Sequence, residues 1–132
     1  MSLTFDQLRA ANIARLPQFK NSKGLPAHSL PDGSDWSPAQ WLQAVLGELG
    51  EYANIRNKFE RGDLSFEEYA PLAAKELADV QTYLDILALR CLDHEGRGMY
   101  KATDPDTRLG IPGGVDLGQA TLAKFNEVSI RV

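Results

Sequence analysis

The amino-acid sequence predicts an all-α fold with a four-helix core and two long loops, and three observations lead to that prediction. Three segments begin with a capping-box pair, in which a Ser or Thr is followed three residues later by Gln or Glu. Apolar residues in these segments recur at steps of three and four, the period of one helix face. No segment alternates apolar and polar residues as a half-buried strand does. Helices are therefore the expected elements along the chain.

The first capping box, Thr4 with Gln7, predicts a helix over residues 4–16 that ends before Pro17. Residues 17–36 are rich in Pro, Gly, Asn, Asp and Ser, which favour turns. The segment is longer than most connections between helices. We therefore expect a loop that serves as a lid or as a binding segment.

The second helix is expected over residues 38–61. Ser37 and Gln40 form its capping box, and Pro38 occupies the first helical position, where proline is favoured. Gly62 follows as a C-terminal stop. Its apolar stripe is formed by Leu42, Val45, Leu46, Leu49 and Ala53.

The third helix is expected over residues 66–92, after the capping box of Ser65 and Glu68. Pro71 predicts a kink or a fresh helix start, because proline cannot donate the main-chain hydrogen bond of a helix interior. Five glycines and two prolines in residues 93–116 predict the second long loop. A last helix is expected over residues 117–131.

Composition limits the classes of protein that the chain can belong to. Its 132 residues suit a single domain over residues 1–132. With 14 basic and 18 acidic side chains the net charge is −4, which argues against binding a nucleic acid polymer. A single cysteine fits the reducing cytoplasm, and no apolar run approaches the length of a membrane span. We expect a cytoplasmic protein without a membrane partner.

Two pairs of carboxylates give the first indication of chemistry. Glu48 and Glu51 lie three residues apart on the second helix, and Glu76 and Asp79 have the same spacing on the third. Residues three apart share one helix face, so the four carboxylates converge if the two helices are antiparallel neighbours. Such a group is costly without cations, and hard divalent cations prefer oxygen ligands. The alternative is that both pairs simply face water.

Two further features favour the metal site over the solvated alternative. Gly47 and Gly50 are unfavourable in a helix interior, which suggests that a helix or a ligand approaches the backbone beside Glu48. On the third helix, Tyr83 and Arg90 continue the side that carries the carboxylates. A guanidinium beside a carboxylate-bound metal suits a phosphate-bearing substrate.

These motifs resemble those of the MazG-like all-α nucleoside triphosphate pyrophosphohydrolases. The similarity rests on the ExxE pair Glu48-Leu49-Gly50-Glu51, the ExxD pair Glu76-Leu77-Ala78-Asp79, and a late Lys124-x-Asn126 element. It implies Mg²⁺-dependent cleavage of (deoxy)nucleoside triphosphates to the monophosphate and pyrophosphate, with Mn²⁺ as a possible substitute. House-cleaning or control of the nucleotide pool would be the cellular role.

The resemblance also implies roles for individual residues. Glu48, Glu51, Glu76 and Asp79 would hold the metal ions, and which of the glutamates orients or deprotonates the attacking water stays open. The residues implied to contact phosphates are Tyr83, Arg90 and Lys124, while Asn126 would bind a phosphate or the sugar.

The residues that would form the base pocket are where this chain differs most clearly from the family it resembles. The chain is similar to the deoxycytidine triphosphate pyrophosphatase branch, in which an aromatic group and a polar residue of the first helix embrace the base. Asn12 occupies the position of that polar residue, and Trp36 or Trp41 would stack on the base; for Trp41 a core position is the alternative. The branch's tryptophan after the ExxE segment is replaced by Asn57 and Lys58, and at this position Lys58 is the residue expected to bind the base. Base preference therefore stays open.

Other interpretations of the same motifs are a phosphoribosyl-ATP pyrophosphohydrolase and a non-enzymatic helical interaction module. In so small a chain, amphipathic helices leave apolar surface uncovered. The resemblance likewise implies a homodimer or homotetramer, in which a second subunit would complete the base pocket. His28 in the first loop is expected at the surface, with contact to a base as the alternative.

Overall fold

The computed structural model describes residues 1–92 and 114–130, and this part of the chain is helical without a β-strand. The all-α prediction is confirmed for these residues. Each expected helix ends within two residues of its predicted bounds, and residues 93–113 of the second long loop lie outside the described residues. The elements are α1 (Phe5–Arg15), a short 3₁₀ helix η1 (Leu16–Gln18), α2 (Pro38–Glu60), α3 (Phe66–Arg90) and α5 (Leu117–Ile130).

The capping residues determine where three of these helices begin. Thr4, Ser37 and Ser65 each accept a hydrogen bond from the main-chain N–H three residues on. The side chain of the Gln or Glu at that position accepts one from the main-chain N–H of the cap residue. After α2 the chain turns at Gly62, whose φ of +85° suits glycine. These local signals confirm the predicted helix starts and the stop after α2.

Pro71 does not begin a new helix, so of the two predicted outcomes the fresh start is wrong. The helix runs without interruption from Phe66 to Arg90 with Pro71 inside it. The proline removes one main-chain donor near the start of a helix of 25 residues. Packing along the rest of that helix, including buried Tyr69 and Ala73, outweighs this local loss.

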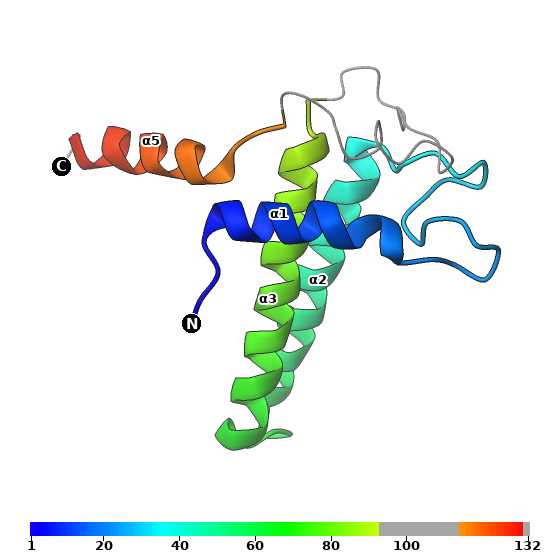
Figure 1. Ribbon diagram of the computed structural model, residues 1–132. Coiled ribbons are helices and arrows are strands. Elements are labelled where there is room, and N and C mark those ends of the chain that lie inside the picture. The colour runs from blue at the N-terminus through cyan, green and yellow to red at the C-terminus, as the bar shows by residue number, and fades with distance from the viewer. Residues whose placement is uncertain (93–113, 131–132) are drawn as a thin grey trace.

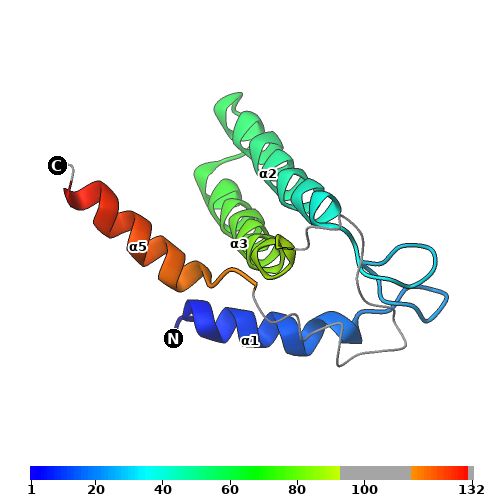
Figure 2. The ribbon, with the colours of Figure 1, turned by 90° about the horizontal axis from the view of Figure 1, so that it is seen from above.

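Two long helices and one crossing helix make up the body of the molecule. Figure 1 shows α2 and α3 side by side as an antiparallel hairpin, with α1 running across it. The view from above places α3 between α2 and α1, and α5 extends away from the hairpin beyond the start of α1 (Figure 2). In the described residues, no helix is long and apolar enough to cross a membrane.

The core is small and lies where η1, α2 and α3 meet. Leu16, Trp41 and Ile86 form its centre, with Tyr83 and Trp36 packed against it. Much apolar surface stays uncovered elsewhere, on α2, α3 and α5. The exposed large side chains of these helices are Leu42, Leu46, Leu49, Phe66, Leu72, Leu77, Leu84, Leu122, Phe125 and Val128.

No helix of the described residues approaches the backbone at Gly47 and Gly50, so of the two expected neighbours only a ligand stays a prediction. A Cβ atom built on either glycine meets no atom of the described chain within 4 Å. The space beside this part of α2 is therefore open within the described part of the chain.

Two ion pairs, each with a buried aspartate, hold the outer segments against α3. Asp35, at the end of the first long loop, binds the guanidinium of Arg90 through Nε, and both side chains are at most 2% exposed. On the same helix, Asp85 receives Arg9 Nε at 3.0 Å and Asn12 Nδ2 at 3.0 Å, both from α1. The first loop and α1 are thus held in defined positions against α3.

Candidate metal centre

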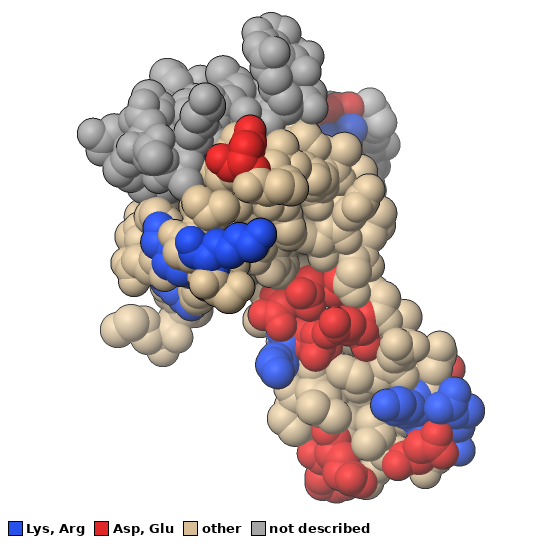
Figure 3. Space-filling model, turned by 90° about the vertical axis from the view of Figure 1, so that its right-hand side faces the viewer, with Lys and Arg blue, Asp and Glu red and all other residues tan. Residues whose placement is uncertain are grey.

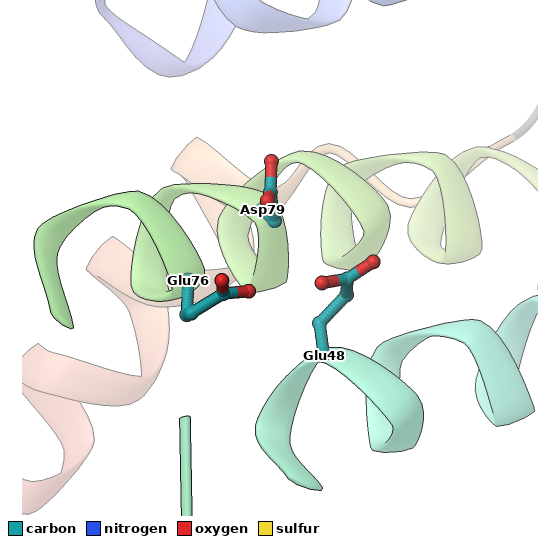
Figure 4. Close-up of side chains that lie close together, drawn as sticks. All are labelled: Glu48, Glu76 and Asp79. Atoms are coloured by element: carbon teal, nitrogen blue, oxygen red, sulfur yellow. The ribbon is translucent and has the colours of Figure 1, made fainter. Parts of the chain in front are cut away.

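The α2–α3 hairpin brings together three of the four carboxylates named from the sequence. Glu48, Glu76 and Asp79 each offer an oxygen within 4.8 Å of the others. Glu48 projects from α2 toward α3, and the carboxylates of Glu48 and Glu76 face each other across the interface (Figure 4). On the surface, acidic side chains gather at the middle of the hairpin, next to the crossing with α1 (Figure 3). The equal three-residue spacing on two antiparallel helices produces this convergence.

Glu76 is the most buried member of the cluster and forms no ion pair within residues 1–92 and 114–130. Its side chain is 8% exposed, and its buried Oε2 has no hydrogen-bond partner in the described residues. Burial raises the pKa of Glu76, and the charge of Glu51, a hydrogen bond with Glu51 and the charge of Asp79 raise it further. The charge of Lys75 acts in the opposite direction and lowers the pKa of Glu76. A buried carboxylate among like charges is the environment that a bound cation would relieve.

The pKa values of Glu48 and Tyr83 are raised by burial and by the same group of negative charges. The pKa of Glu48 is raised by desolvation and by the charges of Glu51, Asp79 and Glu76. Burial raises the pKa of the Tyr83 hydroxyl, and the charges of Glu48 and Asp79 add to the effect. Tyr83 therefore lies within the field of the cluster.

The residues present fit a hard divalent cation. Carboxylate oxygens are its preferred ligands, and around a Mg²⁺ ion such oxygens lie about 3 to 4 Å apart. The 4.8 Å limit within the cluster is near that spacing, so modest side-chain rotations suffice to reach it. Glu51 is exposed and lies outside the group of three, although its charge reaches Glu48 and Glu76. It borders the site as a further carboxylate.

The side chains expected to contact phosphates lie in three different places. Tyr83 is beside the cluster, and its hydroxyl is 3.1 Å from His28 Nε2. Arg90 is buried in its ion pair with Asp35 and does not face the carboxylates as an exposed cation. Lys124 and Asn126 are exposed on α5, where Lys124 pairs with Glu127 at 3.2 Å. In this arrangement neither Arg90 nor Lys124 joins the cluster.

Of the residues expected to bind a base, Asn12 lines a pocket that also includes Asp79 and Tyr83, and the others lie elsewhere. Trp41 has no exposed surface and belongs to the core, the alternative named for it above. Asn12 is 7% exposed and donates to Asp85 and to the Thr82 carbonyl. Lys58 is exposed ten residues beyond Glu48, about 15 Å along the helix axis. Trp36 is half-buried against the core cluster.

A pocket of about 200 Å³ opens beside the cluster and contains residues that the sequence did not indicate. Asp79 and Tyr83 belong to its wall, and so do Arg15 at the end of α1 and His28 and Phe19 of the first loop. His28 is half-buried rather than at the surface, and its ring packs edge-on against Trp36. The proline-rich composition indicated a binding loop, but no local pattern pointed to Arg15 or Phe19.

The chain was compared with protein-family models, curated proteins and solved structures, and none of the three comparisons found a match.

Proposed function

We propose that the chain is a divalent-cation-dependent nucleotide pyrophosphohydrolase of the MazG-like type. The observation that supports this proposal is the convergence of Glu48, Glu76 and Asp79, in which the buried Oε2 of Glu76 has no hydrogen-bond partner among the described residues. A cluster that only faced water would not need a carboxylate that is 8% exposed. Mg²⁺ is the proposed ion, with Mn²⁺ able to substitute, because both take oxygen ligands.

The proposed reaction is attack of water on the α-phosphorus of a (deoxy)nucleoside triphosphate. The bond between that phosphorus and the bridging oxygen breaks, and the products are the nucleoside monophosphate and pyrophosphate. Glu48, Glu76 and Asp79 would hold the cation, which when bound lowers the pKa of water and neutralises charge on the phosphates. Glu51, exposed at the border of the cluster, is placed to orient the water or to accept its proton.

The uncovered apolar surface supports a homo-oligomer as the working form. Leu42, Leu46 and Leu49 follow one another along exposed α2, and α5 has exposed side chains along its length. Isolated helices of 14 residues are marginal in water, so α5 would gain stability from a second copy. We further propose a cytoplasmic location, because the chain has a single cysteine.

Hydrolysis of a panel of nucleoside triphosphates tests the proposal. Pyrophosphate release is expected with Mg²⁺ and is expected to stop with a chelator. The Glu48→Gln variant is expected to lose at least about a hundredfold in kcat, because removing a metal ligand weakens the charge stabilisation of the reaction. Glu67→Gln, at an exposed position in the first turn of α3, is the matched control and should keep full activity.

The same panel separates the alternatives named from the sequence. The panel includes phosphoribosyl-ATP, and selective turnover of that compound would favour the phosphoribosyl-ATP pyrophosphohydrolase. No turnover of any substrate, together with no response of the wild type to Mg²⁺, would leave the interaction module as the better interpretation.

A further inference from the structure

An anion bound at the carboxylate cluster needs a positive partner from the protein besides the cation. Arg90 is held in a buried ion pair with Asp35, and Lys124 lies on exposed α5. Lys75 is near Glu76, since its charge lowers the pKa of that carboxyl, but Lys75 does not line the pocket beside Asp79. The basic residue that does line this pocket is Arg15.

Arg15 is placed to act on a ligand rather than to hold the fold together. Its side chain is exposed in the last turn of α1, and it forms no ion pair with a carboxylate in the described residues. The guanidinium carbon lies over the ring of Phe19, 5.4 Å from its centroid. This contact supports the guanidinium and leaves its N–H donors available to an anion.

The pocket connects Arg15 to the candidate metal centre. Asp79, a member of the carboxylate cluster, forms one part of the wall, and Arg15 forms another part of the same pocket. A phosphate chain bound to a cation at Asp79 and extending into the pocket therefore meets the guanidinium. The remaining walls include Tyr83 and His28, whose side chains bind each other at 3.1 Å and keep this side of the pocket in place.

We propose that Arg15 binds the phosphate chain of the substrate and positions it against the carboxylate cluster. This inference rests on the proposed function and names a residue of that site. A guanidinium suits the task because it stays protonated and can donate two parallel hydrogen bonds to a phosphate. The end of α1 and the first loop thus form the substrate-binding side, opposite the carboxylates of α2 and α3.

Two competing explanations make different predictions for Arg15. If it acts only through general charge attraction, removing Lys75 should weaken binding equally, because both changes remove one positive charge near the cluster. If it contacts the base, its loss should weaken nucleotide binding and leave inorganic triphosphate unaffected. Inorganic triphosphate carries the phosphate chain without base or sugar and therefore separates these cases.

The experiment is calorimetric titration of inorganic triphosphate in the presence of Mg²⁺, with wild type, Arg15→Gln, Arg15→Lys and Lys75→Gln. We expect Arg15→Gln to weaken binding about tenfold or more, Arg15→Lys to recover part of the loss, and Lys75→Gln to change it less than about threefold. Unchanged melting temperatures would confirm that Arg15, which is exposed, is not needed for folding.

The possible outcomes separate this inference from the proposed function. Wild-type affinity in Arg15→Gln, or equal losses in Arg15→Gln and Lys75→Gln, would overturn the role of Arg15 and leave the proposed function in place. Arg15-dependent binding of triphosphate without hydrolysis of any nucleotide would overturn the proposed function alone. A wild type that binds no triphosphate with Mg²⁺ would overturn both.

Discussion

The buried carboxylates on α3 and beside it fall into two sets, which differ in the charges of the side chains around them. Asp85 and Asp35 are at most 2% exposed, and each is bound by an arginine. Glu76 on α3 is 8% exposed and faces carboxylates instead, and within the part of the chain that the structure describes one of its buried oxygens has no hydrogen-bond partner. A buried charge is stable when it is paired, so the first set stabilises the fold and the second has the character of a binding site.

The largest loss of stability is expected when the ion pair that neutralises a buried carboxylate is broken. Arg90→Ala leaves the carboxylate of Asp35 buried without its guanidinium, so the free energy of unfolding should fall by about 3–5 kcal/mol. Urea denaturation measures this change. Arg61→Ala is the matched control, because Arg61 and Asp63 form an exposed pair that contributes less than about 1 kcal/mol. Equal losses in both variants would remove the contrast between buried and exposed pairs.

Arg9→Ala tests the second compensated carboxylate and should have a smaller effect. Arg9 binds Asp85 at 3.0 Å and donates to the Val115 carbonyl at 2.6 Å, while Asn12 continues to donate to Asp85 in the variant. We expect a loss of about 1.5–3 kcal/mol, the range for hydrogen bonds to charged groups. A loss below that of Arg61→Ala, measured in the same urea series, would contradict the role given to this pair.

Gly50→Ala tests whether the space beside the cluster is open within the chain. No atom of the described residues lies within 4 Å of a Cβ at this position, and alanine is the better helix former. The variant should be more stable by about 0.5–1 kcal/mol in thermal unfolding without a ligand. A destabilised variant would show that a contact outside the described structure, such as a second copy, occupies this space.

The smallest change in stability is expected for Glu76→Gln in the absence of divalent cations. This variant should be stabilised, whereas the arginine variants should be destabilised. The folded-state pKa of Glu76 is raised above its ordinary value, so its contribution to stability is present at low pH and is lost as the pH rises through that pKa. Glutamine removes this loss, so the variant should melt above wild type near neutral pH. Melting curves with a chelator between about pH 4 and pH 8 measure it. A difference that shrinks as the pH rises would contradict the account.

Local patterns were enough to predict the helices and most of the carboxylate cluster. The capping boxes of Thr4, Ser37 and Ser65 act within four residues, so the sequence shows them directly. The same holds for the pair Glu76 and Asp79, whose spacing alone places both on one helix face. Helical geometry also explains why Glu51 stays at the edge of the carboxylate cluster. Two neighbouring helices contact each other along one line, and the exposed side chain of Glu51 lies off that line.

Long-range pairings account for what the sequence did not reveal. Arg90 has the spacing of a substrate contact along α3, yet its partner Asp35 lies 55 residues away in the first loop. Asn12 likewise binds Asp85 across 73 residues, and Arg15 reaches the pocket only because α1 crosses the hairpin. Periodicity describes one helix at a time and carries no information on how loops and helices pack against each other.

The most direct test of the central claim is the effect of Mg²⁺ on the melting temperature of wild type, Glu76→Gln and Glu67→Gln. A cation that binds the folded state at a hundred times its Kd stabilises it by about 2.7 kcal/mol. We predict this stabilisation for wild type and for Glu67→Gln, whose substitution lies outside the cluster, and its loss in Glu76→Gln. Equal responses to Mg²⁺ in all three proteins, or no response in wild type, would contradict the assignment of a metal site to Glu48, Glu76 and Asp79.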